Sequence, residues 1–188
     1  MNSNLACQEE LQEELLNGET VLMSPRPTIN HNIVSGNIYR VFGTYLSGKT
    51  CIPFVDGVDV YLTPKDRVIP DGMIVCNREI IKRNGIHGTP DLIVEVLSPS
   101  TKKNDKGYKK NLYQTCGVQE YWIVDIGSKS VEVYLLEDGT FVLDEVYQLP
   151  PECAELDDEE RAQYKTQIKV SLYDDLIVPL EIIFRNLF

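Results

Sequence analysis

The chain has 188 residues, 43% of them hydrophobic, which suits one domain with a buried core and excludes disorder as the default interpretation. No stretch reaches the roughly 18 consecutive apolar residues of a membrane helix, and the acidic N-terminus lacks the opening of a signal peptide, so we expect one cytoplasmic domain over residues 1–188 with no membrane partner. The formal net charge of −11 argues against a nucleic-acid partner, because Lys and Arg supply most of the affinity for a phosphate backbone.

Helical patterns dominate the first quarter of the chain. Residues 5–17 have helical character that ends at Asn17-Gly18, and a short strand is expected at Thr20–Met23. From Thr28 to about Leu46, apolar residues recur at three- and four-residue steps. This spacing predicts an amphipathic helix.

Strand patterns dominate from residue 51 onward. Runs rich in β-branched and aromatic residues predict strands at Cys51–Val55, Val58–Leu62, Val68–Cys76, Leu92–Leu97, Glu120–Val124, Val131–Leu136 and Phe141–Tyr147. Between them, Asn104 is placed to cap a helix from Asp105 to about Cys116, and Gly117 is placed to end it. The acidic residues 149–163 are expected to form a surface excursion before residues 168–188 pack back. The order of elements predicts a mixed α/β fold.

The five cysteines are widely scattered along the chain and include no CxxC pair. Their odd number and spacing fit neither a disulfide framework nor a zinc site. We therefore expect Cys7, Cys51, Cys76, Cys116 and Cys153 to be reduced and mostly buried.

Two acidic residues stand where burial is costly. Asp71 opens the apolar run GMIVC after Pro70, and Glu95 lies within LIVEVL. A carboxylate inside a strand needs a cation, hydrogen-bond donors or a wet cleft, because apolar neighbours do not replace its hydration. If the two strands are neighbours, both carboxylates offer hard oxygen ligands for Mg²⁺ or Mn²⁺. The alternatives are an ion pair at a sheet edge for Glu95 and a strand-entry turn for Asp71.

A candidate cation follows on the next helix. Asp105, Lys109 and Tyr113 recur at four-residue steps and so share one helix face. A lysine beside two metal-binding carboxylates can orient the attacking water and stabilise charge that develops on phosphorus. An ordinary Asp105–Lys109 helix pair is the alternative. The neighbouring Lys102, Lys103, Lys106 and Lys110 are more simply explained as a solvated helix face.

Taken together, these motifs resemble the Uma family of bacterial proteins described as restriction endonucleases. The resemblance spans roughly residues 12–136. Near its start, Glu14-Leu15-Leu16-Asn17-Gly18-Glu19 and Met23-Ser24-Pro25 resemble the opening strand of that family. His31 resembles a residue of the family's first long helix. It continues through Pro70-Asp71, the run from Pro90-Asp91 to Thr101, Asp105-xxx-Lys109-xxx-Tyr113, and the run from Gly117 to Asp125.

The resemblance implies a PD-(D/E)xK nuclease with a restriction-endonuclease-like core, a central mixed β-sheet flanked by helices. It implies that Asp71 and Glu95 bind a divalent metal with the backbone carbonyl of Val96. The superfamily usually places its lysine two residues after the acidic strand residue, where this chain has Leu97. Lys109 is then the replacement supplied by the helix.

Two further residues enter through the resemblance. Glu14 is a candidate for a second-shell or second-metal carboxylate, in competition with Glu13 and Glu19. His31 is a candidate for the cleft, although a lone helical histidine is more often a surface or packing residue.

The predicted function is metal-dependent hydrolysis of DNA phosphodiester bonds by a homodimer, because cutting both strands is commonly solved by pairing two sites through two-fold symmetry. Two other functions stay open. One is a nuclease-fold module that binds nucleic acid or protein without catalysis, which the acidic total charge favours. The other is a metal-dependent hydrolase of a small phosphorylated substrate.

Overall fold

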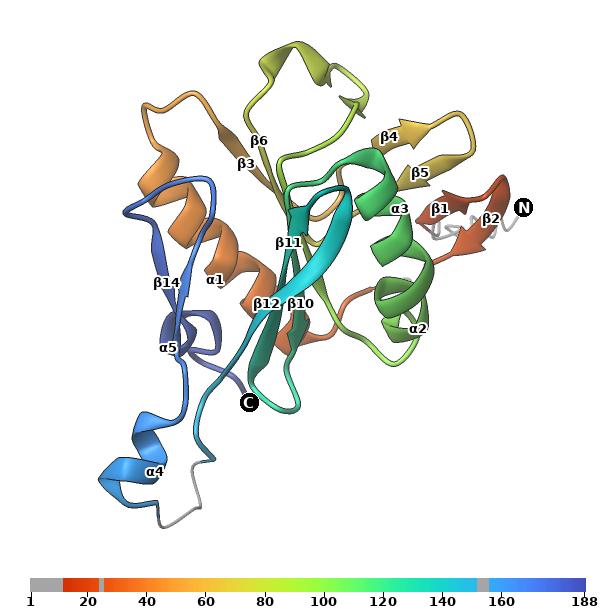
Figure 1. The fold of residues 1–188 in the computed structure, drawn as a ribbon. Coiled ribbons are helices and arrows are strands. Elements are labelled where there is room, and N and C mark those ends of the chain that lie inside the picture. The colour runs from red at the N-terminus through yellow and green to blue at the C-terminus, as the bar shows by residue number, and fades with distance from the viewer. Residues whose placement is uncertain (1–11, 24–25, 152–155) are drawn as a thin grey trace, which may run out of the picture.

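A six-stranded mixed sheet forms the centre of the computed structural model, which describes residues 12–23, 26–151 and 156–188 (Figure 1). In spatial order its strands are β12 (Thr140–Gln148), β11 (Ser130–Glu137), β10 (Glu120–Asp125), β9 (Leu92–Val96), β6 (Gly72–Val75) and β3 (Ile52–Val55). β9 and β10 are parallel, and every other neighbouring pair is antiparallel. β9, which carries Glu95, is therefore an internal strand, so the interpretation of Glu95 as an edge ion pair is wrong.

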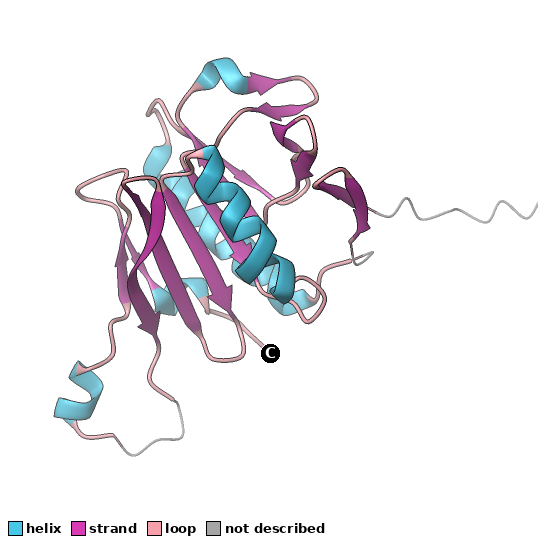
Figure 2. Cartoon of the chain, turned by 45° about the vertical axis from the view of Figure 1, so that its right-hand side comes forward, coloured by secondary structure: helices cyan, strands magenta, loops and turns pink. Residues whose placement is uncertain are grey.

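Helices cover both faces of this sheet. On one face lies α1 (Ile29–Leu46), the helix that the apolar spacing predicted. Thr28 caps its N-terminus, because the Thr28 hydroxyl accepts a hydrogen bond from the His31 N–H. On the other face a continuous helix is built from α2 (Lys102–Asn104), a π-helical turn η2 (Asp105–Lys109) and α3 (Lys110–Cys116) (Figure 2). The predicted mixed α/β fold, a central mixed sheet flanked by helices, is confirmed.

The two helices create two hydrophobic cores. Leu92, Val94 and Val96 of β9 face the α1 side, whereas Ile93 faces the α3 side. We expected one face of β9 to be core and the other to hold a site. Instead, both faces are buried along most of the strand, and only its C-terminal end at Glu95 is left for polar chemistry.

A second six-stranded sheet lies beside the first, with β1, β2, β4 and β5 on the right in Figure 1 and the yellow-green hairpin of β7 and β8 at the top. Its strands in spatial order are β2 (Glu19–Leu22), β1 (Glu13–Leu16), β5 (Asp66–Val68), β4 (Val60–Thr63), β8 (Gly85–His87) and β7 (Ile81–Lys82). The predicted strand Val68–Cys76 is thus two strands, β5 and β6, in different sheets, because Pro70 interrupts the ladder.

The predicted helix over residues 5–17 is wrong in its described part. Residues 13–16 form β1, which pairs with both β2 and β5. Asn17 and Gly18 have φ values of 52° and 81°, the two left-handed residues of a tight hairpin turn. Cross-strand pairing outweighs the helix propensity of the glutamates and leucines. Residues 5–11 lie outside the described residues.

The helix after β9 starts earlier than its sequence indicated. It begins at Lys102, and Asn104 makes no side-chain cap. The backbone carbonyl of Ser98 accepts hydrogen bonds from Thr101 and Lys102, so the turn at residues 98–101 leads directly into the helix. Gly117 ends it in the left-handed conformation, with a φ of 86°, as predicted.

The C-terminal segment packs against α1, as expected. It contains α4 (Asp158–Ala162), β13 (Gln167–Lys169), β14 (Ile177–Pro179) and α5 (Leu180–Ile183). The Asn37 side-chain amide donates to the carbonyls of Ile183 and Arg185, which joins α1 to the end of the chain. No helix among the described residues is long and apolar enough to span a membrane.

A disulfide joins Cys51 and Cys76, so the expectation that these cysteines are reduced is wrong. The two residues are 25 positions apart in sequence but face one another beside the Ile52–Val75 pair of β3 and β6. Strand register brings them together, and spacing in sequence carried no sign of it. Cys116 is free, and Cys7 and Cys153 lie outside the described residues.

Removing this disulfide is expected to destabilise the fold. Cys51→Ser/Cys76→Ser should lower the free energy of unfolding by about 2–4 kcal/mol, because the cross-link restricts the unfolded chain. Denaturant unfolding under oxidising conditions measures the difference. Cys116→Ser is the matched control and should change it by less than about 1 kcal/mol. Equal stability of the double variant and the parent would contradict the prediction.

Candidate functional site

The three residues expected to form the site converge on one cavity. Asp71 directly precedes β6, and the antiparallel pairing of Gly72 with Val94 places it across from Glu95. Glu95, Asp71 and Lys109 all line a cavity of about 260 Å³. The predicted proximity of the two carboxylates on neighbouring strands is confirmed.

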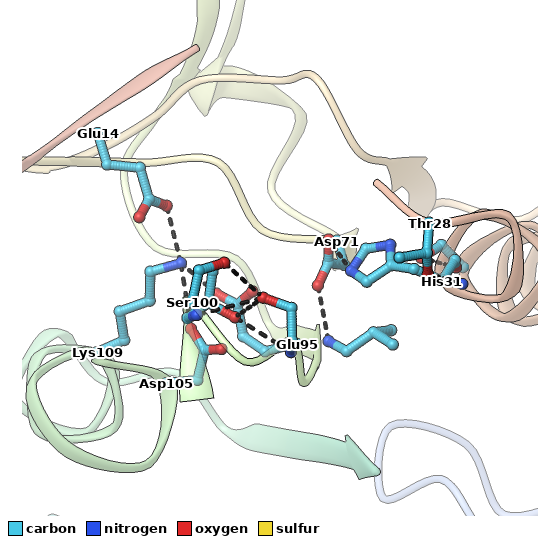
Figure 3. A network of polar contacts seen from close by, with 12 residues as sticks. Glu14, Thr28, His31, Asp71, Glu95, Ser100, Asp105 and Lys109 are labelled. Atoms are coloured by element: carbon cyan, nitrogen blue, oxygen red, sulfur yellow. Dashed lines mark hydrogen bonds and ion pairs between the residues drawn. The ribbon is translucent and has the colours of Figure 1, made fainter. Parts of the chain in front are cut away.

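Lys109 is the centre of a buried ion cluster (Figure 3). Its Nζ lies 2.8 Å from Glu14, 3.1 Å from Glu95 and 3.5 Å from Asp105. Lys109 is 1% exposed, and the three carboxylates are 1–3% exposed. The helix pair with Asp105 exists, but it is the longest of the three contacts. Of the competing glutamates it is Glu14 that enters the cluster, because Glu13 of β1 and Glu19 of β2 are exposed to solvent.

Negative charge exceeds positive charge in this cluster. Burial lowers the pKa of Lys109, but attraction to the three carboxylates outweighs burial and raises it, so the ammonium stays charged. Burial raises the pKa of Glu95 well above its usual range, Lys109 only partly opposes this, and repulsion from Asp105 adds to it. The pKa of Asp105 is raised by burial in the same way. One lysine does not balance three buried carboxylates.

Asp105 has the least satisfied side chain of the cluster. Neither of its side-chain oxygens accepts a hydrogen bond, although both are buried. An unsatisfied buried carboxylate costs several kcal/mol, unless a cation compensates it. The cation that faces Asp105 is Lys109, 3.5 Å from Oδ1, and burial still raises the pKa of this carboxyl.

Asp71 is held by two groups on opposite sides of its carboxylate. The backbone N–H of Val96 donates to Oδ2 at 2.7 Å, and His31 Nε2 lies 3.2 Å from Oδ1. Burial lowers the pKa of His31, but the hydrogen bond to Asp71 and its negative charge outweigh burial, so the pKa is raised. His31 lines the cavity and contacts Asp71, so it stays a candidate site residue.

Tyr113 fixes the position of the other carboxylate. Its hydroxyl donates to Glu95 Oε1 at 2.6 Å, and burial together with the charge of Glu95 raises the pKa of Tyr113 well above its usual range. The phenol thus remains a hydrogen-bond donor. Asp105, Lys109 and Tyr113 share one helix face, as their spacing predicted.

Asp56 is a site residue that the sequence analysis missed. It follows β3, lines the cavity, and donates its backbone N–H to the Asp71 carbonyl at 3.1 Å. Burial and the charge of Asp71 raise its pKa. The only sequence signal was an Asp-Gly pair after a strand, which is typical of an ordinary turn.

The other clustered lysines make ordinary surface contacts. Lys102 lies 3.5 Å from Asp125, and Lys106 lies 2.5 Å from Glu132. The solvated-face interpretation is correct for these two residues.

A mixed sheet that brings carboxylates from paired strands to a buried lysine is the architecture of a nuclease-like α/β protein. The fold is similar to a solved structure from Anabaena variabilis ATCC 29413 described as "a putative nuclease belonging to DUF820". The two align with a TM-score of 0.65 over 93% of this chain and 90% of that chain, at 16% identity. An identity this low shows the common fold alone.

A family model identifies the chain more closely. The model described as "Putative restriction endonuclease" (Uma2) matches residues 4–171. The chain therefore belongs to the Uma2 family, and the resemblance seen in the sequence motifs is confirmed. It is also 31% identical over 111 residues to "Uncharacterized protein slr1290" from Synechocystis sp. (strain ATCC 27184 / PCC 6803 / Kazusa). That match covers 58% of this chain and 58% of the relative.

The raised pKa values predict that stability depends on pH. In the folded state the pKa of Glu95 lies above its ordinary value of 4.5, and the pKa of Asp105 lies above its ordinary value of 3.8. Both groups therefore bind protons more tightly in the folded state than in the unfolded state. Their stabilising effect is present at low pH and is lost as pH rises through the folded values. In EDTA, the free energy of unfolding should therefore fall as pH rises above about 4.5, and Glu95→Gln should flatten that fall. Glu19→Gln, on exposed β2, should leave it unchanged. A slope that Glu95→Gln does not alter would contradict the assignment.

Removing the buried cation should be costly. Lys109→Ala leaves three buried carboxylates without their shared cation and should lower the free energy of unfolding by about 3–5 kcal/mol at neutral pH. The loss should shrink in acid, where the carboxylates can bind protons. Lys106→Ala removes an exposed ion pair and should cost less than about 1 kcal/mol. Denaturant unfolding at two pH values tests both, and equal losses for the two variants would refute the central role of Lys109.

Proposed function

We propose that this protein is an endonuclease that hydrolyses DNA phosphodiester bonds with Mg²⁺ or Mn²⁺ held by Asp71 and Glu95. The observation that carries the proposal is the meeting of two carboxylates from paired strands with a buried lysine at one cavity. Membership of a family described as restriction endonucleases supports the same reaction.

The residues present fit a divalent metal. Asp71 and Glu95 offer carboxylate oxygens, which are the ligands of Mg²⁺ and Mn²⁺. Three carboxylates around a single lysine, one of them without a hydrogen-bond partner for its side-chain oxygens, support a further cation in this place. Among the described residues, no three His, Cys, Asp or Glu side chains are grouped to hold a metal. Mg²⁺ usually needs only one or two carboxylates, because waters and substrate phosphates complete its coordination.

The chain's own residues have distinct roles in this proposal. A divalent ion, when bound, supplies Lewis-acid chemistry at phosphorus. His31 and the Val96 N–H orient Asp71, and Tyr113 orients Glu95. The Val96 carbonyl is a third candidate ligand, on the same peptide segment that contacts Asp71.

Lys109 stabilises charge that develops on the phosphate and orients the attacking water. Its Nζ lies 3.1 Å from Glu95 Oε1. The helix therefore supplies the ammonium group beside Glu95, which the apolar Leu97, two residues after Glu95, cannot supply. Glu14 and Asp105 hold the ammonium in position from the opposite side. A homodimer, which would align two such sites on opposite strands, remains part of the proposal.

A cleavage assay with matched variants tests the function. Purified protein should cut duplex or single-stranded DNA with Mg²⁺ or Mn²⁺, and EDTA should abolish cutting. Asp71→Ala and Glu95→Ala should lower the rate at least about 100-fold, because each removes a metal ligand. Glu19→Gln should cut at the parental rate, which controls for the loss of an acidic residue.

The same assay separates the alternatives. Cutting that persists in both ligand variants would refute the proposed site. Metal binding by calorimetry without cleavage of DNA or RNA would favour a non-catalytic nuclease-fold module, which the net charge of −11 also fits. Hydrolysis of a small phosphorylated compound that long duplex DNA does not compete would favour the small-substrate hydrolase.

A further inference from the structure

Lys82 and Arg83 are adjacent exposed cations at the tip of the β7–β8 hairpin. Lys82 pairs with Gly85 across the hairpin, so Arg83 and Asn84 form its two-residue turn. Within the part of the chain that the structure describes, neither cation has a hydrogen bond or an ion pair. By contrast, Lys102, Lys106 and Lys165 each contact a carboxylate.

The hairpin is held rigidly. Ile86 is buried, and its N–H donates to the Asp59 carbonyl at 2.8 Å. Gly85 has a φ of 138°, and a Cβ there would lie 2.4 Å from the same carbonyl oxygen, so only glycine fits. His87 stacks on Tyr61 with ring centroids 4.5 Å apart, and its Nε2 lies 3.1 Å from the Asn84 side chain. A rigid element loses little conformational entropy when it binds a partner.

The segment of sequence that forms the hairpin is basic although the chain is acidic. Residues 77–88 contain Arg78, Lys82 and Arg83 but one acid, Glu79. Arg78 donates to the backbone carbonyls of Thr50 and Lys49, so its charge is not neutralised by a carboxylate. Uncompensated cations on a protein of net charge −11 attract phosphate, whereas paired ones do so weakly.

The hairpin and the candidate site are connected by one sheet. Its order β2-β1-β5-β4-β8-β7 runs from β1, which carries Glu14, to the hairpin, shown in yellow-green at the top of Figure 1. Four strand spacings of about 4.8 Å, or about 19 Å, separate β1 from β7 across the sheet. The hairpin precedes the N-terminal end of β9 and Glu95 lies near the C-terminal end, so the distance to the candidate site is at least this large, or about six base pairs of duplex at about 3.4 Å each.

We propose that the β7–β8 hairpin is a DNA-contacting element, in which Lys82 and Arg83 bind backbone phosphates of a duplex about six base pairs from the cleaved bond. A two-stranded ribbon is narrow enough to lie at a groove of the duplex. The inference rests on the proposed nuclease function and adds to it a second place where the protein holds the DNA duplex. It also explains how an acidic protein binds a polyanion, through a local basic element and not through its net charge.

Binding measurements in EDTA test the inference without cleavage. The Lys82→Ala/Arg83→Ala variant and the parent are compared by fluorescence anisotropy on a 30-base-pair duplex across a range of salt concentrations. Losing two phosphate contacts should make the slope of log K against log salt shallower by about 1.8. Lys165→Ala/Lys169→Ala is the matched control, because it removes two exposed lysines that are paired with acids, and it should leave the slope unchanged.

Duplex length gives a second measurement that general surface charge would not affect. On duplexes with fewer than about six base pairs on either side of the binding centre, parent and hairpin variant should bind equally. Equal thermal unfolding of the two proteins shows that the variant folds, as expected for exposed side chains without partners.

The outcomes separate the inference from the proposed function. A hairpin variant with the parental salt slope on the long duplex would overturn the inference, and would do so even if the parent cleaves DNA. Increased self-association of that variant with unchanged binding would assign the cations to protection of the β7 edge instead. A parent that binds DNA through the hairpin without cleaving it would refute the nuclease proposal alone. A parent that neither binds nor cleaves DNA would overturn both.

Discussion

The ammonium of Lys109 is the contact on which the arrangement of the site depends. It joins Glu14 from the second sheet, Glu95 from the central sheet and Asp105 from its own helix, so three separate elements meet at one atom. Away from water, each of these charges is costly alone and acceptable only with the others. Three carboxylates around one ammonium also explain why burial raises the pKa of Glu95 and of Asp105.

Packing on both faces of β9 places this chemistry at the end of the strand. Val94 and Val96 bury one face under α1, and Ile93 buries the other under α3. Polar groups are therefore confined to where β9 ends and the turn at residues 98–101 begins. The π-helical turn over Asp105–Lys109 lies at this point, and such turns are frequently found at functional sites.

The lysine of the cavity comes from a helix and not from the strand that carries Glu95. Leu97, two residues after Glu95 on the same segment, lines the cavity with its apolar side chain. The helix behind the strand supplies the ammonium, and its proximity to Glu95 requires the fold to hold the two elements together.

Local periodicity and turn chemistry were enough to predict the helix that ends at Leu46, most strands and the left-handed end at Gly117. The same periodicity placed Asp105, Lys109 and Tyr113 on one helix face. The acids Asp71 and Glu95 were also visible, since a carboxylate in an apolar run requires a partner. Only the tertiary structure decided which partner. Strand register paired Cys51 with Cys76, turned Glu14 inward in place of Glu13, and brought Asp56 and His31 to Asp71. Contacts between segments far apart in sequence leave no periodic signal, so the fold alone selects them.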